Sequence, residues 1–146
     1  AYDNAHTVIV NREDDIILTG YGDLWGDAGK MDMFLKQISL KGEEIWTHTY
    51  GGTENDRAMT VFQLQDGGYI LCGFTQSFGE GDWDAYIVKT GSTGDMQWTS
   101  TFGTPAPDFG YDIIQSRNGH FFVTGWSHGP GHPEGDLLLI KTCHSY

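Results

Sequence analysis

Basic residues are scarce in this chain of 146 residues. Eight lysines and arginines stand against twenty aspartates and glutamates, which gives a formal net charge of -12 at pH 7. A protein that binds nucleic acid needs a basic surface against the phosphates, so this charge argues against a nucleic-acid partner. It argues equally against binding to anionic membrane surfaces.

Long apolar runs and cysteines are also few. No apolar run approaches the roughly 20 residues of a membrane-spanning helix, so we expect no membrane insertion. Two cysteines, Cys72 and Cys143, are too few for a disulfide framework, and Cys72 lies in an apolar strand where it is expected to be buried. The acidity, the absence of tags and the aromatic-rich repeat favour a secreted or extracellular protein, and the start at Ala1, without signal peptide or initiator Met, fits a mature, processed chain.

The chain does contain an internal repeat with an interval of 52 residues. Residues 69–74 return at residues 121–126, and the first copy at 16–21 is displaced by 53 because the next loop is one residue shorter. Other residues recur one interval apart: Asp32, Asp84 and Asp136; Gly42 and Gly94; Trp46 and Trp98; Asp56 and Asp108. A period of this length is typical of propellers, solenoids and similar arrays.

Each repeat is predicted to form four short strands, A to D. In the second copy these are expected at residues 58–64, 69–74, 85–89 and 96–101. Asp-Gly and Asn-Gly pairs between strands A and B suit tight hairpins. Strands B and C are nearly continuous apolar runs, which favours strands that are covered on both faces. A glycine interrupts strand B in every copy, where a bulge or a close backbone approach is expected: Gly20, Gly73 and Gly125.

Three motifs of the repeat match one known pattern. Residues 66–79 read Asp-Gly-Gly-Tyr-Ile-x-x-Gly-x-Thr-x-Ser-Phe-Gly, residues 84–89 read Asp-x-Tyr-x-Val-Lys, and residues 46–56 contain Trp-x-x-Thr-Tyr-Gly-Gly-x-x-x-Asp. These motifs resemble the β-propeller repeats of bacterial and archaeal proteins, and the resemblance covers essentially the whole chain. It implies a propeller fold and says little about activity, because such repeats are scaffolds in proteins of many kinds.

The number of repeats differs from that family. We expect one domain at residues 1–146, with repeats at about 1–54, 55–106 and 107–146, and the third repeat lacks a strand D after Lys141. The predicted fold is therefore all-β, with three blades of 4, 4 and 3 strands. Closed propellers have about four to eight blades, so a homodimer is expected to close one six-bladed ring. A β-trefoil, which also has three four-stranded repeats, is the alternative.

The loops that follow strands B and D are longer and more variable than the other turns, and they are expected at one end of every blade. Variable loops on a rigid scaffold often carry binding sites. An aromatic ring beside carboxylates suits a sugar, because the ring packs on the C–H face while the carboxylates accept hydroxyl hydrogen bonds. The predicted ligand-binding residues are Asp23, Trp25, Asp27, Asn55, Arg57, Glu80, Asp82, Trp83, His128, His132 and Glu134.

Structural roles for some of these residues stay open. The tryptophans could pack between blades, and the recurring aspartates at the starts of strands A and C are expected to cap turns. His128, His132 and Glu134 are competent metal ligands, but a proline and two glycines interrupt them and their spacing matches no strong motif. We therefore predict neither a metal nor a cofactor.

No catalytic signature occurs in the sequence, so we expect a binding protein that is not an enzyme. The first hypothesis is a lectin whose several shallow sites bind glycans and gain by avidity. The second is a structural or protein-interaction propeller module without sugar binding. The third is a fragment of a glycoside-active enzyme, because many acids lie on the predicted loop face.

Overall fold

The regular structure of the chain is entirely β in the computed structural model, which describes residues 2–23, 30–129 and 134–142. The eleven strands of these residues are β1 (Asp3–Val10), β2 (Ile16–Gly22), β3 (Asp32–Ile38), β4 (Glu44–Tyr50), β5 (Asp56–Gln63), β6 (Tyr69–Thr75), β7 (Asp84–Thr90), β8 (Met96–Phe102), β9 (Asp108–Gln115), β10 (Phe121–Ser127) and β11 (Asp136–Thr142). None of the described residues forms a helix that could cross a membrane.

Each repeat forms an antiparallel sheet of its own. The first sheet has the order β1-β2-β3-β4, the middle sheet β5-β6-β7-β8 and the third sheet β9-β10-β11. The predicted all-β fold with 4, 4 and 3 strands is thereby confirmed, and the strands of the second repeat lie within two residues of their predicted bounds. In a trefoil the repeats share one barrel, so three separate sheets are a different topology.

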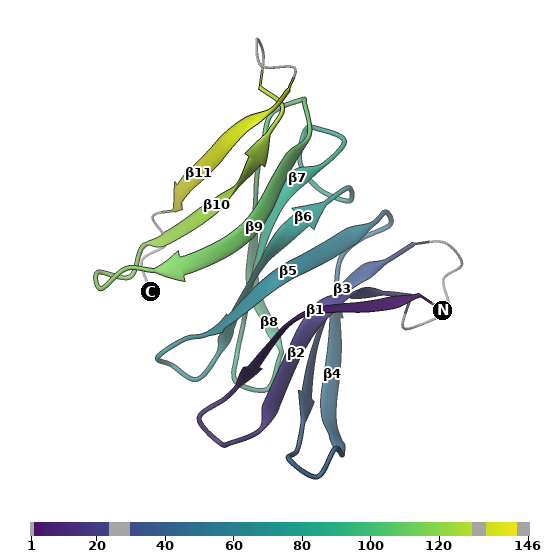
Figure 1. Cartoon of the computed structure of the whole chain (residues 1–146), viewed down its shortest axis with the longest axis vertical. Helices are drawn as coiled ribbons and strands as arrows, with labels where there is room; N and C mark the ends of the chain where they lie inside the picture. The colour runs from purple at the N-terminus through teal and green to yellow at the C-terminus, as the bar shows by residue number, and fades with distance from the viewer. Residues whose placement is uncertain (1, 24–29, 130–133, 143–146) are drawn as a thin grey trace.

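The three sheets lie side by side in chain order (Figure 1). One face of the middle sheet packs against the first sheet, through Leu71 and Val88 on one side and Ile17 and Leu35 on the other. The opposite face packs against the third sheet through a second apolar cluster: Leu64, Ile70, Cys72, Ile87, Ile113, Phe121 and Val123. The middle sheet is therefore covered on both faces, as the continuous apolar runs of its strands predict.

The glycine of strand B sits opposite a bulge in every sheet. In the middle sheet the register of β5 shifts between Ala58 and Thr60, opposite Gly73. A Cβ added at Gly73 would collide with the carbonyl oxygen of Arg57, and Gly20 and Gly125 meet a β1 or β9 carbonyl in the same way. The close backbone approach predicted at these positions is thus confirmed.

Cys72 lies inside the second apolar cluster. Its side chain is fully buried, and burial raises the pKa of its thiol, so the reactive thiolate is suppressed. The expectation of a small buried hydrophobic residue is confirmed. Cys143 lies outside the described residues.

Equivalent positions of the repeat differ sharply in exposure at the two ends of the row of sheets. On the face turned toward the preceding sheet, Val61 and Ile113 are 4% and 3% exposed, whereas Val8 of the first sheet is 61% exposed. On the opposite face, Leu35 and Ile87 are fully buried, whereas Leu139 of the third sheet is 62% exposed. The first and third sheets each leave one apolar face uncovered in the described chain.

Candidate functional site

Backbone hydrogen bonds join the loops after strands B and D at one end of the sheets. The amide of Asp56 donates to Met31 O at 2.6 Å, and that of Gln76 donates to Asn55 O at 2.8 Å. At the next junction Asp108 N donates to Trp83 O at 2.7 Å, which is the equivalent of the bond from Asp56 N to Met31 O. These contacts place the described part of the predicted loops on one face, which we call the loop face.

Aspartates hold the turns of this face. Asp56 Oδ2 accepts hydrogen bonds from Gly52 N at 2.8 Å and from Ser77 Oγ at 2.7 Å, and its Oδ1 accepts from the Thr75 hydroxyl. Asp108 Oδ2 accepts from Thr104 N at 2.6 Å and Thr104 Oγ1 at 2.9 Å. Both carboxylates are buried. These bonds satisfy backbone donors in the turns, which is the capping role predicted for Asp56 and Asp108.

Asp84 has a similar position at the start of β7 and accepts from Gly81 N at 3.0 Å. Burial and then the charge of Asp108 raise its pKa, although hydrogen bonds from the backbone oppose the shift. Two interacting carboxylates such as Asp84 and Asp108 could suggest acid–base chemistry. Each side chain, however, is 1% exposed, and one oxygen of each accepts a hydrogen bond from a turn. Their geometry is that of structural capping groups.

A continuous series of ring–ring and cation–π contacts crosses the loop face from the first sheet to the third. The Arg57 guanidinium lies 4.8 Å from the ring centre of Tyr21 and 5.3 Å from that of Trp83. Trp83 in turn is 6.1 Å from Phe109, which is 5.6 Å from Trp126. The ends are His6, 5.3 Å from Tyr21, and His128, 4.1 Å from Trp126. We call these seven side chains the aromatic row.

The aromatic row explains where three predicted site residues lie. Arg57 is held by cation–π contacts with two rings from different sheets, and each such contact is worth about 0.5–1 kcal/mol where solvent has access. Trp83 packs edge-on against Phe74 and remains partly exposed. His128 ends the row in the third sheet. Part of the Trp83 surface thus serves packing between sheets, and the rest faces the solvent.

A polar chain runs beside the row. Asn55 Oδ1 accepts from Met31 N at 3.2 Å, and Asn55 Nδ2 donates to Gln76 Oε1 at 2.9 Å. Gln76 Nε2 then donates to Asp82 Oδ1 at 3.0 Å. Each amide is oriented by its neighbour, and the exposed Asp82 carboxylate accepts the last hydrogen bond of this chain, one residue before Trp83 in the sequence.

The other predicted site residues are only partly connected to these two features. Asp23 is partly exposed at the end of β2, and its amide donates to Tyr2 O at 3.3 Å. Glu80 and Glu134 are exposed on the loops before β7 and β11. Trp25, Asp27 and His132 lie outside the described residues. In the part of the chain that is described, no three His, Cys, Asp or Glu side chains gather where they could hold a metal ion.

Several residues of the loop face were missed by sequence reasoning. Tyr21, Phe109, Trp126 and Gln76 lie on this face but are not among the residues that the sequence predicts as ligand-binding. A signal was present in the repeat, since Tyr21, Phe74 and Trp126 are equivalent positions at the end of strand B and all are aromatic. Tyr111, at the bulge of β9, is 45% exposed and stacks on Phe109 at 6.4 Å.

Comparisons with known proteins add no relative. No protein-family model matches the chain, and no curated protein sequence matches it significantly.

Proposed function

We propose that the chain is a carbohydrate-binding protein, a lectin without catalytic activity, and that it meets its glycans as a secreted or extracellular protein. The observation that carries this proposal is the pairing of the aromatic row with the adjacent polar chain. Trp83 offers partly exposed ring surface, and the oriented Asp82 carboxylate lies next to it in the sequence. A pyranose stacks its C–H face on such a ring while its hydroxyls donate to the carboxylate.

The shape of the face favours shallow binding over catalysis. Asp84 and Asp108, whose charges interact, are buried and cap turns, so they are poorly placed as a general acid and its partner. Of the exposed acids, Glu80 and Asp82 share the loop before β7, and Glu134 lies on the loop before β11. No observation favours the alternative of a glycoside-active enzyme.

A glycan array probed with the labelled chain tests the proposal, followed by titration of the best sugar. We expect Trp83→Ala to weaken binding by tenfold or more and Asp82→Asn to weaken it severalfold. The matched control is Asp95→Asn, which removes an exposed carboxylate from the turn between β7 and β8, at the opposite end of the strands. An array without a reproducible hit would overturn the lectin proposal, as would equal binding by Trp83→Ala and the parent chain.

We also propose that two copies close a six-bladed propeller, as the repeat resemblance implies. Leu139 is equivalent to Ile87, which is fully buried against the next sheet, and Val8 is equivalent to Val61, which is buried against the preceding one. The uncovered face of the third sheet therefore has the same kind of side chains as the faces that pack against a following sheet. The uncovered face of the first sheet has the same kind of side chains as the faces that pack against a preceding sheet. A two-fold axis would satisfy both faces at once.

The mass in solution tests this closure. A value near twice 16.2 kDa is expected for the parent chain. Leu139→Asp should yield monomers, because it buries a charge in the proposed contact. Met96→Asp, at an apolar residue of β8 that is 59% exposed and outside both uncovered faces, should remain dimeric. A monomeric parent chain would refute the closure.

The same uncovered faces favour one alternative, a structural or protein-interaction module. Contiguous exposed apolar side chains such as Ile114, Leu137 and Leu139 mark association surfaces. A monomer that binds no glycan would support this second candidate over the lectin.

A further inference from the structure

A cleft lies at the opposite end of the strands from the loop face. Its volume is about 530 Å³, and its walls include Arg12, Phe62, Gln63, Gln65, Gln115 and Arg117. These residues come from the ends of β5 and β9 and from the turns that follow β1, β5 and β9. β5 has 8 residues, so at about 3.3 Å per residue the cleft is roughly 25 Å from the loop face.

The cleft lies at a junction where one position of the repeat has a different residue type. Arg12, Gln65 and Arg117 are equivalent. At the junction of the first and middle sheets, Arg12 N donates to Gln63 Oε1 at 3.0 Å and Arg12 Nη1 donates to Gln65 O at 2.9 Å, so the arginine bridges the two turns. At the next junction Gln65 stands where that arginine would be. Its side chain is shorter and has no guanidinium, and the cleft lies between the turns there.

The polar groups of the cleft are held by the turns. Gln63 Nε2 donates to Gly67 O at 3.3 Å, and Gln115 Nε2 makes the equivalent bond to Gly119 O, also at 3.3 Å. The Phe62 ring is 45% exposed at the wall. The cleft therefore combines oriented amides with an apolar ring, as in a site for a small polar ligand.

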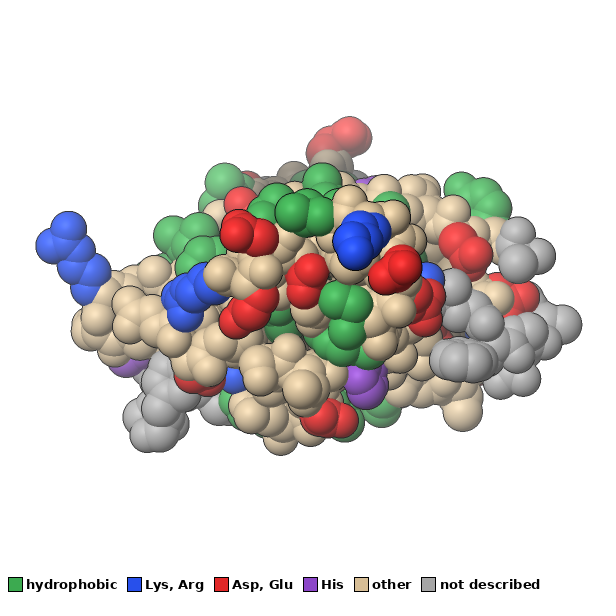
Figure 2. Space-filling view, turned by 90° about the horizontal axis from the view of Figure 1, so that it is seen from below, with side chains coloured by type: hydrophobic (Ala, Val, Ile, Leu, Met, Phe, Trp, Pro, Cys, Tyr) green, Lys and Arg blue, Asp and Glu red, His purple; other side chains and the backbone are tan. Residues whose placement is uncertain are grey.

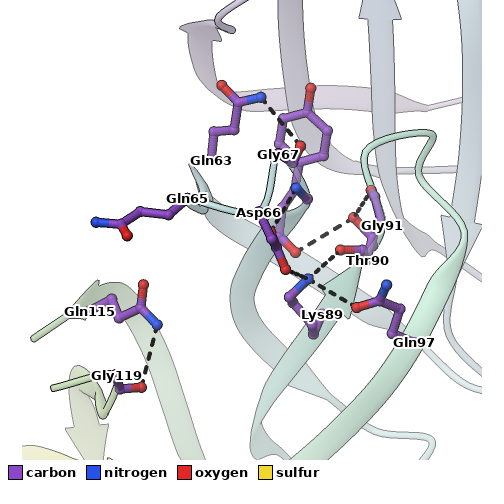
Figure 3. A network of polar contacts seen from close by, with 12 residues as sticks. Gln63, Gln65, Asp66, Gly67, Lys89, Thr90, Gly91, Gln97, Gln115 and Gly119 are labelled. Atoms are coloured by element: carbon purple, nitrogen blue, oxygen red, sulfur yellow. Dashed lines mark hydrogen bonds and ion pairs between the residues drawn. The ribbon is translucent and has the colours of Figure 1, made fainter. Parts of the chain in front are cut away.

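The charge of the cleft is opposite to that of the protein. Two of the three arginines of this acidic chain line it. The one carboxylate in its wall, Asp66, is paired with Lys89 at 3.0 Å (Figure 3). The acidic neighbours of Arg12 on its turn, Glu13 to Asp15, do not line the cleft. Acidic side chains are spread over the lower face of the molecule, and several basic ones lie among them (Figure 2).

We propose that this cleft binds a saccharide that carries a carboxylate, of the uronate type. A guanidinium fork matches a carboxylate in geometry and charge, and Arg12 and Arg117 supply two such groups. The glutamine amides can both donate to and accept from sugar hydroxyls, and the Phe62 ring packs on the apolar face of the sugar. The site is separate from the aromatic row. It binds an anionic ligand through arginines, whereas the loop face presents carboxylates to a ligand.

Titration with methyl glucuronide, methyl glucoside and acetate, followed by NMR shifts of the chain's amide groups, tests the proposal. We expect the glucuronide to bind at least tenfold more tightly than the other two and to shift the signals of Gln65 and Arg117. Arg117→Gln should weaken glucuronide binding about tenfold. The matched control Lys41→Gln, which removes an exposed cation from the turn between β3 and β4, should leave it unchanged.

Gln65→Arg provides an independent variant, because it should bridge the turns as Arg12 does and fill the cleft. We expect it to abolish glucuronide binding while the thermal transition is kept. Equal binding of glucuronide and glucoside would overturn the role of the carboxylate, and equal binding of acetate would overturn the role of the sugar. Undiminished binding by both cleft variants would overturn the site. Trp83→Ala should not affect this binding, so the loop-face proposal and the cleft proposal can fail separately.

Discussion

β7 and β11 have equivalent sequences in the repeat and opposite surroundings. All seven residues of β7 are buried, whereas most of β11 is exposed or only partly buried. The chemistry of the two strands is nevertheless alike, since Leu137, Leu139 and Ile140 are as apolar as Ala85, Ile87 and Val88. Burial in this fold is therefore decided by the neighbouring sheet, and an apolar strand at the end of the row keeps the composition of a covered one.

The difference has an energetic consequence. Full burial of one leucine or isoleucine side chain contributes roughly 1.5–3 kcal/mol. The middle sheet gains this on both faces, and the first and third sheets gain it on one. Any partner that covers the outer faces would stabilise the fold by the same means, so stability should depend on association.

Alanine substitutions at the equivalent positions Ile87 and Leu139 should give the largest difference in stability between the buried β7 and the exposed β11. Ile87→Ala removes a fully buried side chain between two sheets and should lower the free energy of unfolding by about 2–5 kcal/mol. Leu139→Ala, at a position 62% exposed, should cost within about 0.5 kcal/mol in a monomer. Urea unfolding followed by tryptophan fluorescence measures both.

Protein concentration is the control for this pair. If a second copy covers the third sheet, the cost of Leu139→Ala grows as the chain is concentrated, while that of Ile87→Ala is large at every concentration. Equal costs for the two variants in dilute solution would contradict the assignment of exposed and buried faces.

Substitution of the equivalent lysines Lys89 and Lys141 should give the next largest difference in stability. Lys89 is 1% exposed, and its Nζ donates to Asp66 at 3.0 Å, Thr90 O at 2.7 Å and Gln97 at 2.9 Å. Removing one member of a buried pair costs about 3–5 kcal/mol. Asp66 is half exposed, so we expect Lys89→Met to cost less, about 1–3 kcal/mol. The exposed equivalent, Lys141→Met, should change stability by less than about 0.5 kcal/mol.

The pH dependence of the Lys89 variant follows from Asp66. Burial, the largest influence, would raise the pKa of Asp66, but the hydrogen bond from Lys89, the hydrogen bond from the Gly68 amide and the charge of Lys89 together hold this pKa below its usual value. A carboxyl with a lowered folded-state pKa stabilises the fold above its unfolded pKa of about 3.9 and loses this contribution as the pH falls through the folded value. The stability difference between the parent and Lys89→Met should thus shrink in acid. A difference that is constant from pH 7 to pH 3 would contradict the role of the pair.

The strands could be predicted from the sequence because the repeat supplies strands A, B and C three times and strand D twice. The turn glycines and the apolar runs of β6 and β7 mark their boundaries almost to the residue. The aromatic row could not be predicted in the same way, since it depends on contacts between residues of different sheets, such as Arg57 with Tyr21 and Trp83. The cleft lies where Gln65 does not form the bridge that Arg12 forms at the other junction. The residue type of Gln65 alone does not predict a cleft there.

The smallest effect concerns the turn residue that differs between sheets. Asp14 has a φ of 62°, and its equivalents are Gly67 and Gly119, with φ of 87° and 85°. Glycine adopts this left-handed conformation without a Cβ penalty, whereas aspartate tolerates it at a cost. Asp14→Gly should therefore raise stability by a few tenths of a kcal/mol up to about 1, because strain relief is partly offset by the greater freedom of glycine in the unfolded chain. Gly67→Asp should lower stability by a similar amount, and thermal unfolding measures both shifts. Destabilisation by Asp14→Gly would instead mean that the Asp14 side chain stabilises the turn.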